Sequence, residues 1–226
     1  MKTFFAVFAA ALALAACARP NPIATPLRAG PFGAVLLVPG CAGPGEHTAR
    51  AVQDLTQSGF AVATLDWPSG ACRADDAAAG VPAIERALLR LAAVPGVDRA
   101  RLHLVGWAEG GASVLAAMAR TGVRSAAAFY PSCAGLRDWR PTGPVLLMLG
   151  ENDTIAPPET CLAAVGRTQD ADKVLAIRYG GATHGFDDVG PGWAFWRSSA
   201  ASAHNKAVRD AAFSDLRIFL DAYATK

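Results

Sequence analysis

The chain has 226 residues, 52% of them hydrophobic, and its 21 Lys and Arg residues against 19 Asp and Glu residues leave a net charge of +2. A chain of this length and apolar content is able to bury one large core, which excludes an intrinsically disordered protein. It contains no basic run and no patch of basic and aromatic residues, so we expect no nucleic-acid partner.

The first residues are typical of an export signal. Lys2 precedes an uncharged run over residues 4–16, which is too short to cross a bilayer and fits the core of a signal peptide. The run ends in LAAC, which resembles a bacterial lipobox, the motif whose cysteine, here Cys17, becomes acylated. The alternative is an ordinary signal peptide with a chance cysteine.

We therefore expect three segments: a lipoprotein signal peptide over residues 1–16, a proline-rich tether over 17–30 and one domain over 31–226. Ala18, rather than an aspartate, follows the cysteine, which favours the outer membrane by resemblance to enterobacterial sorting. The expected location is the periplasmic side of a bacterial cell envelope, with the chain lipid-anchored to the membrane through Cys17.

Six short apolar runs are predicted to be strands, because continuous apolar runs of this length are typical of parallel strands covered on both faces. They cover residues 33–39, 60–66, 101–106, 125–131, 144–150 and 173–179.

Helical patterns lie between these runs, over residues 47–57, 82–94 and 112–120, and a last helix has an apolar stripe at Val208, Ala212, Leu216, Phe219 and Tyr223. Alternation of strand and helix predicts an α/β fold: a doubly wound, mostly parallel sheet with helices on both faces. Sites in such sheets form beyond the carboxyl ends of the strands.

The string GWAEGG, residues 106–111, follows the third predicted strand directly. A strand, a tight glycine turn and a helix make a nucleophile elbow, in which the central residue is strained. Here Ala108 stands where the nucleophile should be. The backbone N–H of Glu109 is expected to point at a developing oxyanion from the helix N-terminus. A chance glycine-rich turn would give a similar string, so the motif indicates a hydrolase only if an acid and a histidine follow at later strand ends.

Two further residues follow strand ends. Asp153 comes just after the fifth strand and His184 just after the sixth, and elbow, acid, histidine is the chain order of an α/β hydrolase triad. Each residue alone has a plain alternative: a turn or helix-capping aspartate for Asp153, and a solvated loop histidine for His184. Three strand-end positions in the expected order favour the catalytic interpretation.

The segments GWAEGG, GENDTIAP and GATHGFD make nearly the whole mature chain resemble the dienelactone hydrolase family. The resemblance implies an α/β hydrolase fold, no metal or organic cofactor, and ester or lactone hydrolysis through a serine or cysteine at the elbow. It assigns Ala108 to the nucleophile position, Asp153 to the acid and His184 to the base. The second oxyanion N–H would come from the loop after the first strand, near Gly40 and Cys41.

Alanine has no oxygen or sulfur to attack a carbonyl, so we expect a hydrolase scaffold that is inactive or nearly so as written. A natural pseudoenzyme and a nucleophile-substituted variant of an active hydrolase both fit this sequence. The alternative function is a lipoprotein that binds a ligand or partner in the old pocket. The expected ligand is a small ester or lactone-like molecule, and the protein is expected to be a monomer.

A relocated nucleophile is a further possibility. Ser69, Ser132, Cys41 and Cys133 lie near strand ends, but none of them is in an elbow. Ser113 lies inside the helix after the elbow and is expected to point away from the site.

Four cysteines remain after Cys17, an even number that predicts two disulfides in an exported protein. Because strands consecutive in the chain are usually neighbours in space, we expect the pairs Cys41–Cys72 and Cys133–Cys161. Closely spaced Cys or His pairs are absent from the sequence, so we expect no metal site.

Two other features of the sequence have alternative interpretations. The glycine-rich loop GCAGPGEH, followed by Asp66, resembles a dinucleotide-binding loop, but Pro39, Pro44 and the expected disulfide at Cys41 argue against it. The aromatic stretch over 191–199 is interpreted either as a loop packed under the last helix or as an apolar wall or lid of the pocket.

Overall fold

The computed structural model describes residues 22–74, 76–188 and 199–224, with side chains of the last helix from residue 206 onward. The predicted signal peptide over 1–16, Cys17 and nearly all of the aromatic stretch over 191–199 lie outside the described residues. Within the described part, no helix is both long enough and apolar enough to cross a membrane.

Six parallel strands form one sheet, in the order β2-β1-β3-β4-β5-β6. Chain order reverses between β1 and β3, which is the switch point where α/β sheets place their ligands. The predicted doubly wound sheet is thereby confirmed, and the sheet is parallel throughout. The strands are β1 (Phe32–Val38), β2 (Ala61–Thr64), β3 (Val97–Trp107), β4 (Ser125–Phe129), β5 (Val145–Gly150) and β6 (Val174–Tyr179).

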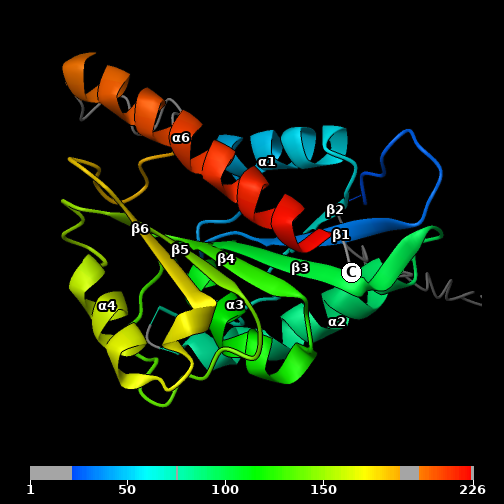
Figure 1. Ribbon diagram of the computed structural model, residues 1–226, viewed down its shortest axis with the longest axis horizontal. Helices are drawn as coiled ribbons and strands as arrows, with labels where there is room; N and C mark the ends of the chain where they lie inside the picture. Colours follow the sequence, from blue (N-terminus) through cyan, green and yellow to red (C-terminus); the bar gives the residue numbers. More distant parts are fainter. Residues whose placement is uncertain (1–21, 75, 189–198, 225–226) are drawn as a thin grey trace, which may run out of the picture.

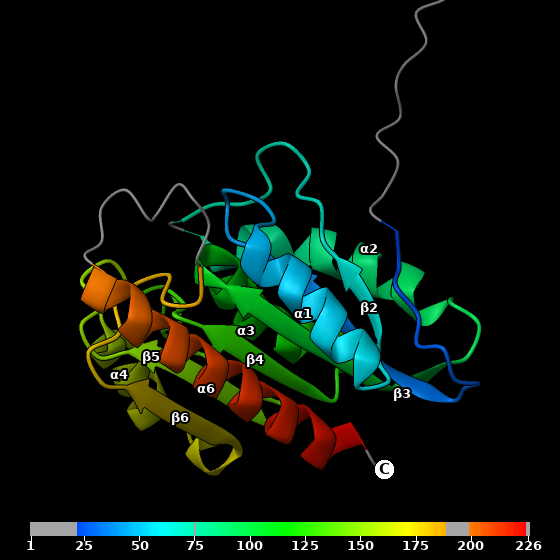
Figure 2. The same cartoon turned by 90° about the horizontal axis from the view of Figure 1, so that it is seen from above.

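Helices cover both faces of the sheet (Figures 1 and 2). One face carries α1 (Glu46–Gln57) and α6 (Ser199–Ala224), and the other carries α2 (Val81–Ala92), α3 (Ala108–Thr121) and α4 (Pro158–Arg167). Side chains that alternate along β1 therefore enter two cores: Val35 and Leu37 face α1 and α6, while Leu36 and Val38 face α2 and α3. Burial on both faces explains why the strands are continuous apolar runs.

Two helical features differ from the sequence prediction. The helix α4 was not predicted, because it is short, starts after Pro157 and buries only the small side chains Pro158, Cys161 and Ala164. The helix α3 begins at Ala108 rather than at residue 112, so its first turn includes two glycines. Glycine is a poor helix former, and here the close packing of that turn on β1 and β3 overrides its propensity.

Part of the segment expected to act as a tether lies against the domain. Ala24 pairs with Val62 of β2 through two backbone hydrogen bonds of 2.9 and 2.8 Å. The Arg28 guanidinium donates to the carbonyl oxygen of Gly59 at 3.1 Å. Residues 22–30 are therefore attached to the β2 edge of the sheet.

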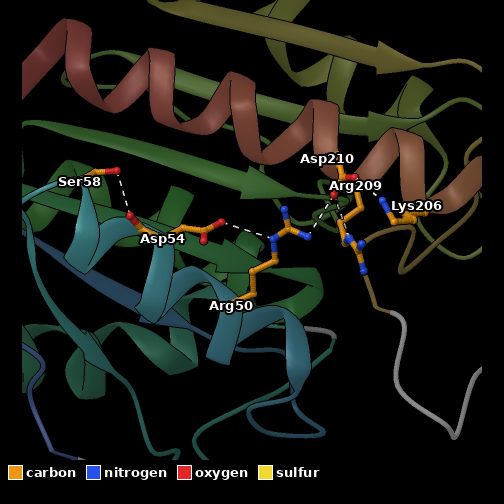
Figure 3. A network of polar contacts seen from close by, with 6 residues as sticks. All are labelled: Arg50, Asp54, Ser58, Lys206, Arg209 and Asp210. Atoms are coloured by element: carbon orange, nitrogen blue, oxygen red, sulfur yellow. Dashed lines mark hydrogen bonds and ion pairs between the residues drawn. The ribbon is translucent and has the colours of Figure 1, made fainter.

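Polar contacts join the two helices of one face, as Figure 3 shows. Nη1 of Arg50 on α1 lies 3.0 Å from Oδ1 of Asp210 on α6, and its Nε lies 3.3 Å from Oδ2 of Asp54. The same guanidinium stands 5.0 Å from the centre of the Phe213 ring. Ion pairs this exposed contribute at most about 1 kcal/mol each, so apolar packing of α6 on the sheet is the main contact that holds the helix.

Candidate active site

Ala108 occupies a nucleophile-elbow geometry at the junction of β3 and α3. Its φ is +50°, in the left-handed region that side chains other than glycine rarely adopt. A Cβ at Gly110 would collide with the carbonyl oxygen of Pro39, and one at Gly106 would collide with the carbonyl of Gly110. The two glycines therefore let the helix start pack on the strand ends, and the residue between them is forced into the strained turn.

Asp153 and His184 form a hydrogen-bonded pair at the ends of β5 and β6. Nδ1 of His184 lies 2.8 Å from Oδ2 of Asp153, whose side chain is buried. The other carboxylate oxygen accepts the N–H groups of Ile155 and Ala156 at 2.9 and 2.8 Å. The aspartate thus fixes the imidazole, which is the orienting role of a triad acid.

The hydrogen bonds also decide the protonation state of Asp153. Burial raises the pKa of this carboxyl, but the hydrogen bonds from His184 and from the Ala156 and Ile155 amides outweigh that effect, so its pKa lies below the ordinary value. An ionised carboxylate accepts, so Nδ1 of His184 donates the hydrogen bond to Asp153.

A small cavity of about 130 Å³ lies between the elbow and the Asp153–His184 pair, called the dyad below, at the carboxyl ends of the strands. Both Ala108 and His184 line it, as does Ser132 from the loop after β4. The other lining residues are Ala74, Glu109, Ile155 and Ala156. The three positions predicted from strand ends are therefore brought together at one site.

A larger groove lies elsewhere, beside α2, with a volume of about 720 Å³. It is lined by Ile23, Asp66, Arg86 and Arg90 among others, and by none of the predicted catalytic residues. The elbow cavity, although smaller, is the one with reactive groups, so it is the candidate active site.

Both predicted disulfides are confirmed: Cys41 pairs with Cys72, and Cys133 pairs with Cys161. The first bond ties the loop after β1 to the segment that brings Ala74 to the cavity. Cys41 and Cys133 are therefore not available as nucleophiles.

The serine candidates separate clearly. Ser113 is buried, with its hydroxyl oxygen against Gly80 rather than in the cavity. Ser69 is exposed and does not line the cavity. Ser132 lines the cavity together with His184, which leaves it as the hydroxyl to test. Among the described residues, no group of three or more His, Cys, Asp or Glu side chains is placed to hold a metal ion.

Of the two predicted oxyanion donors, the N–H groups of Cys41 and Glu109, the first is engaged in a hydrogen bond. The backbone N–H of Cys41 donates to Oε2 of Glu109 at 3.1 Å. The sequence pattern predicts a role for the backbone of Glu109 only, and it contains no sign of this contact of the side chain.

Sequence reasoning also missed a buried network below the dyad. Asp187 is fully buried and accepts the Tyr130 hydroxyl at 2.5 Å and Nε1 of Trp107 at 2.7 Å. Trp107 directly precedes the elbow, and the Tyr130 ring stands edge-on to the His184 ring. Burial raises the pKa of Asp187 even though these donors oppose the shift. The only sequence signal was the acidic residue three positions after His184.

A doubly wound sheet whose third strand runs into a left-handed residue at a helix start is the arrangement of α/β hydrolases, and this chain shares it. Its sequence matches the model of the Dienelactone hydrolase family over residues 22–222. The chain belongs to that family.

Solved structures share the fold at low sequence identity. A dienelactone hydrolase-like promiscuous phosphotriesterase from metagenomic libraries is 20% identical, with 87% of this chain and 88% of that chain covered and a TM-score of 0.67. Esterase 2 of Thermogutta terrifontis phosphorylated by paraoxon is 16% identical, with 90% and 89% covered and a TM-score of 0.62. The same esterase phosphoramylated by tabun is similar to the same degree, with 90% of both chains covered. Among curated proteins, none matches the chain significantly.

Proposed function

We propose that this chain is an ester or lactone hydrolase scaffold that turns esters over at or near the background rate, because Ala108 stands at the nucleophile position. The observation that carries the proposal is that Ala108, at a left-handed φ of +50°, lines the same cavity as His184. Loss of the nucleophile in a serine protease costs about 10⁶ in turnover, which is roughly 8 kcal/mol of barrier.

A serine at position 108 would supply the missing nucleophile. Its Oγ would form a bond to the ester carbonyl carbon while His184 takes the hydroxyl proton, and the alcohol would leave with that proton. Water, deprotonated by the same imidazole, would then release the acid and restore the serine. Asp153 supports both steps by holding Nδ1 at 2.8 Å.

The test compares the unsubstituted chain with Ala108→Ser on 4-nitrophenyl acetate. We expect background hydrolysis from the first and a clear gain in the second. Adding His184→Ala to the serine variant should remove the gain, because the hydroxyl then has no base. Ordinary enzymatic rates from the unsubstituted chain would contradict the proposal, and loss of those rates in Ser132→Ala would locate the nucleophile at Ser132.

Covalent labelling separates attack from turnover. One structural relative is an esterase phosphorylated by paraoxon, and this motivates the same probe here. In Ala108→Ser, the new Oγ should displace 4-nitrophenolate from paraoxon and gain one diethylphosphoryl group. Mass spectrometry of peptides should find that group at position 108 in the variant and nowhere in the unsubstituted chain. A label at Ser132 in the unsubstituted chain would contradict the assignment.

We also propose that the protein is exported and lipid-anchored through Cys17. The support is the LAAC motif after an apolar run, together with two disulfides, which fit an oxidising compartment. Mass spectrometry of the membrane fraction should find an acylated peptide that begins at Cys17. Recovery of the protein as an unacylated periplasmic chain would contradict this proposal without touching the catalytic one.

A further inference from the structure

The carboxylate of Glu109 turns back from the first turn of α3 onto the loop after β1. Its Oε2 accepts the backbone N–H of Cys41 at 3.1 Å. A Cβ added to Gly40 would lie 3.0 Å from that oxygen and 3.5 Å from Cβ of Ala108. The carboxylate and the elbow side chain therefore face the same short stretch of backbone, beside the cavity that both line.

The engaged N–H is the one that should receive the substrate's oxygen. In acyl transfer the carbonyl oxygen becomes an oxyanion, and the site stabilises it with two backbone donors. Here one donor already holds an anionic oxygen of the chain itself. An arriving oxyanion would have to share that single hydrogen and would stand next to a like charge. Both effects act against the transition state of acyl transfer.

We propose that the Glu109 carboxylate is a resident occupant of the oxyanion hole, which suppresses acyl transfer in this pocket independently of the missing nucleophile. This inference rests on the proposed function for the assignment of Ala108 and Cys41. Glu109 therefore limits which reactions the pocket can support. Ala108→Ser restores the attacking hydroxyl, while the carboxylate of Glu109 still fills the oxyanion hole.

The first experiment needs no activity. Amide spectra by ¹H–¹⁵N NMR are compared for the unsubstituted chain, Glu109→Ala and Glu109→Gln. A bond to a carboxylate draws electron density from the amide proton, so the Cys41 resonance should move upfield in Glu109→Ala and move less in Glu109→Gln. Glu46→Ala, which removes the same charge from the first turn of α1, is the control and should leave the resonance in place. An unchanged Cys41 resonance in Glu109→Ala would overturn the proposal.

The second experiment measures kcat and KM on 4-nitrophenyl acetate in the Ala108→Ser background. Removing one oxyanion donor costs about 10²–10³ in kcat, so freeing the Cys41 N–H with Glu109→Ala should raise kcat at least tenfold. The KM should change little, because the gain arises in the transition state. Glu109→Gln should give a smaller rise, since its amide oxygen still occupies the hole without the charge.

The two proposals fail in different ways. A serine variant that is active, with a kcat that Glu109→Ala does not raise, would overturn the occupancy of the oxyanion hole and leave the proposed function standing. If Ala108→Ser is inactive both alone and with each of the Glu109 substitutions, the nucleophile assignment is overturned. The Cys41 resonance would then decide by itself whether Glu109 holds that amide. Glu46→Ala in the serine background should leave kcat unchanged.

Discussion

The Tyr130 hydroxyl donates to Oδ1 of Asp187 at 2.5 Å, and the Tyr130 ring then stands edge-on to the His184 imidazole, with ring centres 4.7 Å apart. Both partners of the hydrogen bond are buried. The second oxygen of Asp187 holds Nε1 of Trp107 next to the elbow. One buried carboxylate therefore links the Tyr130 ring beside His184 to Trp107, the last residue of β3 before position 108.

Tyr130→Phe removes the donor and leaves a buried carboxylate oxygen without it. We expect a loss of about 1.5–3 kcal/mol in the free energy of unfolding, measured by urea denaturation. Tyr179→Phe is the matched control, because its hydroxyl donates at 2.8 Å to the less buried Asp215, and it should cost less than about 1 kcal/mol.

A double-mutant cycle checks that Tyr130 acts through Asp187. Tyr130→Phe combined with Asp187→Asn should be less destabilised than the sum of the two single variants, since both single changes disrupt the same hydrogen bond. Simple additivity of the two changes would show that the hydrogen bond between these residues contributes nothing.

The buried His103 makes stability depend on pH. Its Nδ1 lies 2.8 Å from Oγ of Ser125, and burial, with the nearby charges of Arg124 and Arg101, lowers the pKa of His103 from 6.5 to about 4. The unfolded chain therefore binds a proton at higher pH than the folded chain does. The contribution of His103 to the free energy of unfolding is therefore fully present above pH 6.5. It falls by about 1.4 kcal/mol per pH unit as the pH drops toward 4.

The measurement is urea denaturation at pH 7 and pH 4.5 for the unsubstituted chain and His103→Leu. Between these two values of pH, the unsubstituted chain should lose about 2–3 kcal/mol more than the variant. Carboxyl groups elsewhere titrate in both proteins and cancel in this difference. Equal losses in the two proteins would refute a neutral, buried His103.

Each disulfide closes a loop of similar length, with sequence separations of 31 and 28 residues. Replacing either pair by alanines should cost about 2–4 kcal/mol in the free energy of unfolding. The two pairs should differ at the site, because only Cys41 carries the N–H that contacts Glu109. In the Ala108→Ser background, Cys41→Ala with Cys72→Ala should therefore alter kcat, while Cys133→Ala with Cys161→Ala should do so less. Equal effects on kcat would contradict this.

The strands and the dyad could be predicted because both depend on local pattern and on the geometry of a parallel sheet. Each strand is buried on both faces and is therefore a continuous apolar run. The carboxyl ends of parallel strands lie at the same edge of the sheet. Asp153 and His184 could therefore be paired before any coordinates, and they lie 2.8 Å apart. The same reasoning paired the four cysteines, because β1 neighbours β2 and β4 neighbours β5.

The remaining parts of the site leave no such pattern. Tyr130 and Asp187 are 57 residues apart, and a buried polar pair has no periodicity that marks it. The contact of Glu109 with Cys41 depends on the direction of one side chain and on the path of a disulfide-tied loop. Neither spacing nor composition contains that information, so only the packed structure reveals that the Cys41 N–H is already engaged by Glu109.

The last prediction concerns the strain at the elbow itself. Ala108 keeps a left-handed φ of +50° although it carries no nucleophile, so the strain is imposed by the packing of α3 on the strand ends. A left-handed conformation costs an L-residue about 1–2 kcal/mol, and the added freedom of glycine in the unfolded chain costs about 0.5–1 kcal/mol. Ala108→Gly should therefore stabilise the protein by about 0.5–1 kcal/mol in urea denaturation. Ala116→Gly, in the interior of the same helix, should instead destabilise it by about 1 kcal/mol. Losses of equal size at both positions would show that position 108 is not strained, and would remove the elbow geometry on which the assignment of the nucleophile position depends.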